Sequence, residues 1–355
     1  MFKMVAAGSF VAILSLLVGC GDEASSEELA ESGEAIAALP SLPTSMVPVP
    51  PSGLLPPLPV VVTLETNVRP TSIALDSSNV YYTDTFELTS EVVARPLAGG
   101  AKTVLHSTFT LPSSLVRFGS TVYWVDFTNA AFSDGGVWSA PTSGASPAVR
   151  LVSHTNPVTA HQSLAVFSTG AGFTYQTHVL YADAWASKLY AIRRWFFSTS
   201  ESSLVPDAFP NYYPFAVAID SSHVYFTHDA GHGLWRVPLA GGTPTLLVSG
   251  EEQPGALVVT GGQIYFVNEG DIKTEPAAGG AASTFAESVG TIQNMVAANG
   301  YLYWSCSSCN TIRKKPLAGG SSTLLVSGQT NLKSLAVDAT HVYFGTNTAL
   351  KRAPN

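Results

Sequence analysis

A unit of about 40 residues is repeated along most of this chain of 355 residues. The pattern is a short apolar run that ends in Asp, then an apolar residue followed by Tyr, then a run that ends in Pro-Leu-Ala-Gly-Gly, and finally a run rich in Leu and Val; the copies match it to different extents. The clearest copies begin at Pro70 and Pro214. Repetition at this period indicates that each copy is one structural unit, which buries its apolar faces against its neighbours.

The copies predict a β-propeller. Each one holds four short runs with β-strand patterning, and four strands at a period of about 40 residues are typical of a propeller blade. Seven pairs of an apolar residue and Tyr mark seven copies: Val80-Tyr81, Val122-Tyr123, Leu180-Tyr181, Val224-Tyr225, Ile264-Tyr265, Leu302-Tyr303 and Val342-Tyr343. We therefore expect an all-β, seven-bladed β-propeller. Six blades are the alternative, because the third copy is degenerate.

The last copy stops before its outermost strand. It ends at Ala353-Pro354, whereas residues 60–64 (Val-Val-Val-Thr-Leu) match the fourth-strand run of residues 245–248 (Thr-Leu-Leu-Val). We expect this N-terminal strand to complete the last blade and close the ring. Closure leaves no blade without its outer strand, and unpaired edges are an aggregation hazard.

The N-terminus has the pattern of a signal peptide over residues 1–19, with Lys3 before an apolar stretch. The run Leu17-Val18-Gly19-Cys20 resembles the lipobox of bacterial lipoproteins. That resemblance implies a diacylated Cys20 that anchors the protein to a membrane. Because Gly21 is not the Asp associated with retention in the inner membrane, it also implies an outer-membrane location, on the periplasmic or the outer surface. Ordinary secretion with cleavage near Gly19 is the alternative.

Residues 20–59 are first acidic and then rich in proline. This composition favours a flexible, extended linker over a packed core. We therefore expect three parts: a signal peptide over 1–19, a linker over 20–59 and a propeller domain over 60–355.

The charges exclude one class of partner and suggest another. Only 12% of the residues are charged, the net charge is −8, and the 17 Lys and Arg residues are spread thinly, which argues against nucleic-acid binding. Acidic residues gather in the loops expected after the second and fourth strands, while Lys and Arg lie on the third strands. An acidic face would steer a basic partner; an ordinary solvating surface is the alternative. The candidate acidic binding face comprises Asp84, Asp126, Asp183, Asp229, Glu252, Glu269 and Asp271.

Two further groups of residues are candidates, one for a disulfide bond and one for a metal site. Cys306 and Cys309 are the only thiols besides Cys20, and we expect a disulfide; a redox Cys-x-x-Cys and half of a zinc site are the alternatives. His228, Asp229 and His232 form the densest group of potential metal ligands, although a solvated polar loop explains them as well. We predict no cofactor, and a divalent cation is possible.

The runs Tyr82-Thr83-Asp84, Trp124-Val125-Asp126 and Phe226-Thr227-His228-Asp229 resemble the YWTD and NHL class of propeller repeats. The class includes receptor ectodomains, scaffold modules and enzymes such as lactonases and lyases. In regucalcin-like lactonases acidic and amide side chains line the channel. Here the inner runs are mostly small and apolar, and only Asn294 and Lys333 lie where they would reach the channel mouth.

Together these features favour a binding module over an enzyme. We expect a monomeric, lipid-anchored, extracytoplasmic propeller that binds a protein or an extracellular polymer through one loop face. The alternative is a metal-dependent, lactonase- or lyase-like enzyme.

Overall fold

The structure is a computed structural model, in which Pro56–Asn355 forms one compact unit. The structure describes residues 58–86, 89–127, 135–154, 163–170, 174–183, 188–195, 198–206, 214–228, 233–251, 255–287 and 289–355. The predicted signal peptide, Cys20 and nearly all of the predicted linker lie outside these ranges. No helix in the described ranges is long and apolar enough to cross a membrane.

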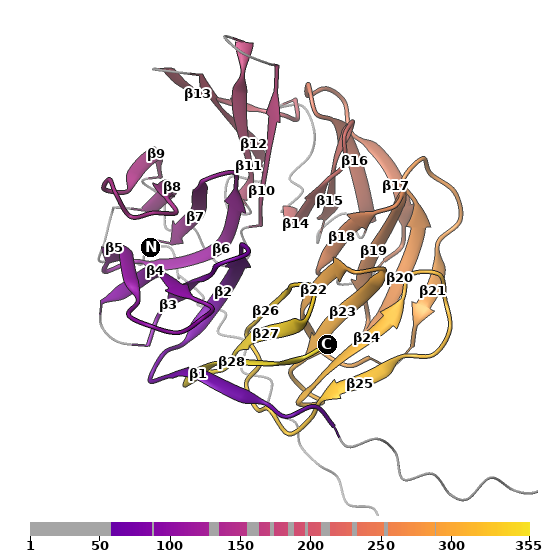
Figure 1. Cartoon of the computed structure of the whole chain (residues 1–355). Helices are drawn as coiled ribbons and strands as arrows, with labels where there is room; N and C mark the ends of the chain where they lie inside the picture. Colours follow the sequence, from indigo (N-terminus) through magenta and orange to yellow (C-terminus); the bar gives the residue numbers. More distant parts are fainter. Residues whose placement is uncertain are drawn as a thin grey trace, which may run out of the picture. The chain divides into compact units, whose positions relative to one another are not determined.

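The described strands form seven antiparallel sheets of four strands each, arranged around an axis (Figure 1). Blade 1 contains β2 (Pro70–Leu75), β3 (Asn79–Asp84), β4 (Ser90–Pro96) and β5 (Thr103–Thr108). Blade 2 contains β6 (Leu111–Phe118), β7 (Thr121–Phe127), β8 (Gly135–Pro141) and β9 (Val149–His154). Blade 3 contains β10 (Leu164–Thr169), β11 (Gln176–Asp183), β12 (Lys188–Trp195) and β13 (Ser198–Ser203).

Blade 4 contains β14 (Pro214–Ile219), β15 (His223–His228), β16 (Gly233–Pro238) and β17 (Thr245–Ser249). Blade 5 contains β18 (Leu257–Thr260), β19 (Gln263–Asn268), β20 (Asp271–Pro276) and β21 (Ser283–Ala286). Blade 6 contains β22 (Ile292–Ala298), β23 (Tyr301–Cys306), β24 (Thr311–Pro316) and β25 (Thr323–Val326). Blade 7 contains β26 (Ser334–Val337), β27 (His341–Gly345), β28 (Ala349–Pro354) and β1 (Val62–Thr66). The prediction of seven blades is confirmed, and the degenerate third copy is a complete blade.

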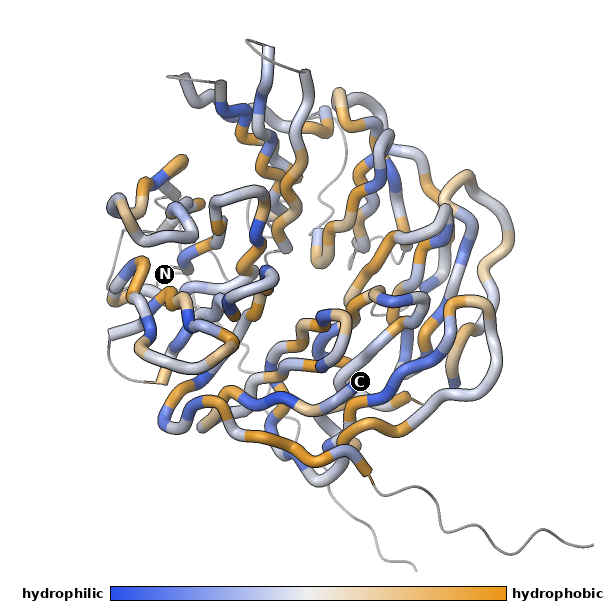
Figure 2. The backbone as a smooth tube through the Cα atoms, viewed as in Figure 1, coloured by the Kyte–Doolittle hydropathy of each residue, from blue (hydrophilic) through white to orange (hydrophobic). Residues whose placement is uncertain are grey.

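The second strand of each blade is apolar on both sides because each side faces a neighbouring blade. In β3, Tyr81 packs against Leu115 and Trp124 of blade 2, while Tyr82 packs against Leu350 of blade 7. Both tyrosines are fully buried. Figure 2 shows apolar residues recurring along the strands of the blades. These two consecutive aromatic residues therefore pack between blades and do not form an exposed surface.

The N-terminal strand closes the ring as predicted. In Figure 1, β1 lies beside β28, and the antiparallel register runs from Val62 opposite Arg352 to Thr66 opposite Ala349. The first and last described strands thus share blade 7, and no sheet of the ring is left with three strands.

Blade 7 also meets blade 1 at very short range. The Ser334 hydroxyl donates to the Pro70 carbonyl at 2.7 Å. A Cβ placed on Gly345 would lie 2.3 Å from the same carbonyl oxygen. Only glycine allows this approach, so Gly345 is required where the two ends of the ring meet.

The blades define two faces of the propeller. We call the face on which the second strands end and the innermost strands begin the mouth face; for example, Pro70 at the start of β2 is opposite Asp84 at the end of β3. The opposite end is the turn face. There the Gly99-Gly100 turn of blade 1 has a positive φ at both residues, 89° and 118°.

A recurring clasp stabilises the turn face. Asp220 follows β14, and its Oδ1 accepts hydrogen bonds from the backbone N–H groups of Ser222 and His223 at 2.7 and 2.8 Å. Its Oδ2 accepts the hydroxyl of Tyr225 at 2.6 Å. Equivalent bonds join Asp76 to Tyr81 and Asp338 to Tyr343. These three aspartates are therefore turn caps.

Candidate binding site at the channel mouth

A cavity of about 380 Å³ opens at the mouth face, where the innermost strands begin. It takes residues from the first six blades, so it lies where these blades converge on the axis. The described residues that line it are Thr71, Ser72, Ser113, Ser114, Leu115, Val116, Ser163, Leu164, Phe215, Ala216, Ala256, Leu257, Gln293, Asn294 and Met295.

The lining of this cavity combines neutral hydrogen-bonding groups with apolar side chains. Hydroxyls come from three neighbouring blades and two amides come from blade 6, while none of the described lining residues is charged. Such a surface can donate and accept hydrogen bonds, but it offers a ligand no ion pair. Concave, mostly apolar sites with a few convergent polar groups are the usual form of ligand pockets.

Irregular backbone shapes the mouth. The innermost strands of blades 1, 2, 4 and 6 each carry a register shift close to where they begin. In β6 the shift lies between Ser113 and Val116, and Ser114 has a φ of 51°. A residue other than glycine in this region costs of order 1–3 kcal/mol, and such strain gathers at functional sites.

Hydrogen bonds between blades hold the mouth in place. The backbone N–H of Leu115 in blade 2 donates to the Ser72 hydroxyl of blade 1 at 2.8 Å. The Asn294 amide of blade 6 donates to the Lys333 carbonyl, which precedes blade 7, at 3.1 Å. The polar groups of the lining are therefore fixed by contacts between blades rather than by their own strand alone.

A second cleft of about 520 Å³ adjoins the mouth between blades 6 and 7. Gln293 lines both spaces, so they share one wall. The cleft adds the exposed cation of Lys333 and the hydroxyls of Ser307 and Ser308. Asn294 lines the mouth and Lys333 lines the adjoining cleft, so the two residues that the sequence places near the channel both contribute to this region.

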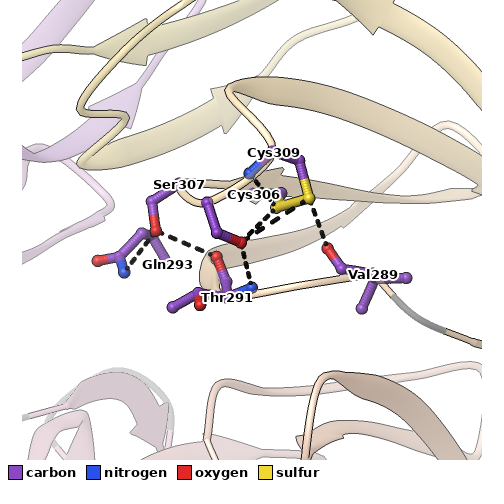
Figure 3. The surroundings of a disulfide bond; sticks show 7 residues. Val289, Thr291, Gln293, Cys306, Ser307 and Cys309 are labelled. Atoms are coloured by element: carbon purple, nitrogen blue, oxygen red, sulfur yellow. Dashed lines mark hydrogen bonds between the residues drawn. A yellow bond between two sulfur atoms is a disulfide. The ribbon is translucent and has the colours of Figure 1, made fainter. Parts of the chain in front are cut away.

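The loop of this cleft contains the predicted disulfide, between Cys306 and Cys309 (Figure 3). Figure 3 shows Ser307 between Gln293 and Thr291: the Gln293 amide donates to the Ser307 hydroxyl at 3.2 Å, and that hydroxyl donates to the Thr291 carbonyl at 3.2 Å. The cross-linked loop therefore supports one wall of the cleft.

The predicted acidic face requires a correction at two positions. Asp84 is 8% exposed and Asp126 is 0% exposed. Asp84 caps the chain entering blade 1, because its Oδ1 accepts the backbone N–H groups of Arg69 and Phe86 at 2.8 and 3.0 Å. Asp84 ends β3, and Asp126 is the last residue but one of β7. Neighbouring blades cover both sides of these second strands, so the two carboxylates are not at the surface.

The structure describes only some of the other residues predicted for the acidic face or for a metal site. Glu269 is exposed and Asp271 is half-buried. Asp183 and His228 end β11 and β15, but their side chains lie outside the described part of the structure. Asp229, His232 and Glu252 also lie outside the described residues. Within the described ranges, no three His, Cys, Asp or Glu side chains gather closely enough to hold a metal ion.

Sequence reasoning missed a buried pair between blades 1 and 2. The Nε2 of His106 in β5 lies 3.9 Å from the Oδ2 of Asp126 in β7, beside the rings of Trp124 and Trp138. Burial raises the pKa of Asp126 to about 7 and lowers the pKa of His106. The signal was available, because Asp126 stands in the apolar run Tyr-Trp-Val-Asp-Phe.

No family model and no curated protein matches the sequence. Solved structures do match it. A streptogramin B lyase structure has a TM-score of 0.63 at 10% identity, over 83% of this chain and 97% of that one. Sqt1 of Saccharomyces cerevisiae has a TM-score of 0.58 at 9% identity, over 83% and 98% of the two chains. A 6-phosphogluconolactonase homologue from Bacteroides fragilis has a TM-score of 0.52 at 15% identity, over 76% and 87%. At these identities the likeness shows the β-propeller fold alone.

Proposed function

We propose that this protein is a lipid-anchored, extracytoplasmic binding module that takes a neutral, polar segment of a protein or an extracellular polymer at the mouth face. The observation that carries the proposal is the uncharged lining of the mouth. Hydroxyls, amides and apolar side chains suit a partner that presents hydrogen-bonding groups without a fixed charge. The bulged and strained backbone at Ser114 supports a functional role for the same place.

The shape of the site fits an extended ligand. The mouth and the cleft between blades 6 and 7 share Gln293, so a chain-like partner can occupy both spaces at once. The contacts between blades fix the polar groups before binding, and a site formed in advance reduces the entropy lost on association. Lys333 adds one cation at the edge of the cleft.

Obstruction of the mouth tests this proposal. Gln293→Trp adds bulk to the wall that the two spaces share, and Ser77→Trp adds the same bulk at an exposed position on the turn face. The full chain would be screened by thermal shift against neutral oligosaccharides and uncharged peptides. We expect a ligand that raises the melting temperature of the wild type and of Ser77→Trp, but not that of Gln293→Trp. A ligand that stabilises all three equally would place the binding surface elsewhere.

The proposed anchor has its own test. Cells that express the chain would be labelled with a fatty acid and then fractionated. We expect label and membrane association in the wild type and in the Cys306→Ser/Cys309→Ser double variant, and neither in Cys20→Ser. Label on Cys20→Ser, or a soluble wild type without label, would contradict lipid anchoring.

A further inference from the structure

Blades 5 and 6 are neighbours in the ring (Figure 1), and a cavity of about 570 Å³ lies at the seam between them. It is separate from the channel mouth and shares none of its lining residues. The described residues that line it are Ala286, Glu287, Val289, Trp304, Cys309, Thr311, Arg313, Lys315, Gly320, Ser321 and Ser322. Two cations on one strand therefore line this cavity, although the net charge of the chain is −8.

The repeat supplies an internal comparison for Arg313. In each blade the residue after the anchor tyrosine of the second strand lies opposite one residue of the third strand. Trp304 is opposite Arg313 in blade 6, Phe266 opposite Lys273 in blade 5, and Phe344 opposite Lys351 in blade 7. The three cations thus occupy equivalent positions in successive blades.

Two of these three cations have a strong partner from the preceding blade. Lys273 pairs with the Glu251 carboxylate at 2.6 Å, and Lys351 donates to the Gln329 amide oxygen at 2.8 Å. Both acceptors follow the outermost strand of the blade before. Arg313 instead donates to the hydroxyl of Ser322, in its own blade, at 3.2 Å. Among the described residues, no carboxylate lies within ion-pair distance of Arg313.

Lys315 shows the same contrast. Lys315 lies opposite Leu302 of β23. The equivalent residue of blade 1 is Arg95, which lies opposite Val80. Arg95 forms an ion pair with Glu65 at 3.1 Å, whereas Lys315 donates to the Phe285 carbonyl and lies 4.7 Å above the Phe285 ring. Both cations of this seam therefore have neutral partners, where equivalent cations elsewhere have an acid or an amide.

Trp304 also lines this cavity. Its side chain is 1% exposed, and its indole N–H is buried without a hydrogen-bond acceptor in the described structure. A guanidinium and an ammonium therefore line one solvent-open space beside this indole ring.

We propose that the seam between blades 5 and 6 binds an oxyanion, the carboxylate, phosphate or sulfate of a small ligand, through Arg313 and Lys315, and that Trp304 reports its binding. The guanidinium fork matches two oxygens of such a group, and charge-assisted hydrogen bonds are the stronger kind. The hydroxyls of Ser321 and Ser322 lie at the same wall and add neutral donors. Glu287, the one acid of the lining, is exposed and leaves the cavity with a net positive charge.

Titration calorimetry and tryptophan fluorescence on the full chain test this site. The probes are inorganic phosphate, sulfate and glucuronate, with glucose as the neutral control. We expect at least one anion to bind at millimolar concentration or below while glucose does not, and the preferred anion distinguishes a phosphate or sulfate from a carboxylate source. The fluorescence change should disappear in Trp304→Phe.

Charge removal on one strand supplies the matched variants. Arg313→Gln should weaken the binding of that anion at least about tenfold. Lys314→Gln removes the same charge from the adjacent position, whose side chain lies over Tyr301 on the other side of β24, and should leave the affinity unchanged. Lys315→Gln provides a second loss variant should Arg313→Gln fail to fold. Equal losses in the Arg313 and Lys314 variants, or binding of none of the three anions, would overturn the proposal.

Discussion

The hydroxyl of Tyr82 in blade 1 donates a hydrogen bond of 2.7 Å to the carboxylate of Glu65, a residue of the strand that completes blade 7. Arg95 of blade 1 pairs with the same carboxylate at 3.1 Å, and Lys102 lies 3.5 Å from its other oxygen. Burial and the bond to Glu65 raise the pKa of Tyr82, so the hydroxyl stays protonated and remains a donor. The closing strand is therefore fixed through its backbone to β28 and through one side chain to blade 1.

Truncation should show how much this strand contributes. Removal of the chain through residue 59 leaves β1 complete, whereas removal through Thr66 takes away β1 and Glu65 together. We expect the first truncation to change the melting temperature little and the second to lower it sharply, because blade 7 loses its outer strand and Arg95 loses its partner. Thermal unfolding followed by circular dichroism measures both. Equal melting temperatures would contradict a stabilising role for the closure.

The clasp on the turn face predicts that removal of one tyrosine hydroxyl lowers the free energy of unfolding. Tyr225→Phe keeps the packed ring but removes the donor to Asp220, and hydrogen bonds to charged groups contribute about 1.5–3 kcal/mol. We expect the free energy of unfolding in urea to fall by about that amount. Tyr175→Phe is the control, because Tyr175 is 45% exposed. A loss no larger than that of the control would mean that the clasp stabilises nothing.

The same clasp predicts a dependence on acid. Burial alone would raise the pKa of Asp220, but the hydrogen bonds from Tyr225, Ser222 and His223 outweigh it and lower the pKa to about 2. A lowered folded pKa contributes stability above the unfolded value of about 3.9, which is lost as the pH falls towards 2. Tyr225→Phe should therefore lose less stability than the wild type between pH 4 and pH 2, and an unchanged difference would argue against the bond.

The contribution of Asp126 to stability should change with pH in the opposite direction to that of Asp220. The raised pKa of Asp126, about 7, means that the folded state holds a proton that the unfolded chain releases above about pH 4. Ionisation therefore costs stability as the pH rises through this window, by up to about 1.4 kcal/mol per pH unit. We expect the stability of Asp126→Asn, relative to the wild type, to increase from pH 4 to pH 7 in urea titrations.

The neighbours of Asp126 define the control for that experiment. His106 is the titrating group that faces it, and burial lowers the pKa of this imidazole. Glu269→Gln removes one negative charge from an exposed position and serves as the matched variant. A difference that is the same at every pH, or that falls as the pH rises, would show that Asp126 is charged throughout.

The disulfide should be present but not essential. Alkylation of the unreduced full chain followed by intact-mass analysis should find no free thiol at Cys306 or Cys309. The loop that the bond closes is short, so the chain-entropy account gives about 2 kcal/mol, and the double Cys→Ser variant should fold with a lower melting temperature. Failure of that variant to fold would show that the bond fixes the cleft more tightly than a local cross-link.

Local patterns that recur from one copy of the repeat to the next were predictable from the sequence. The seven Tyr anchors and the fourth-strand run at residues 60–64 are local patterns, and each gives the same structure wherever it occurs. The Asp turns likewise form the same clasp in blades 1, 4 and 7. The disulfide followed from the short spacing of Cys306 and Cys309. A repeat multiplies each weak signal, which is why blade count and ring closure were both correct.

Features that depend on contacts between copies were not predictable. Asp84 and Asp126 were assigned to a surface because loops usually are exposed, yet the neighbouring blade covers both. The hydroxyls of the mouth come from separate strands that converge only in the ring, and their sequence signal is a Ser or Thr before each apolar run. The partner of Lys273 likewise comes from the preceding blade, whereas Arg313 donates to a serine of its own blade.

Ring closure also sets an order for the making of the protein. Val62 pairs with Arg352, so the first described strand waits for the last one to be synthesised. Six blades draw their strands from consecutive stretches and can form as the chain emerges, whereas blade 7 needs both ends. Until then β1 remains an unpaired edge, the kind of species on which chaperones act. A chain that lacks β28 would therefore leave β1 without a partner strand, and the incomplete blade would be recognisable by its exposed edges.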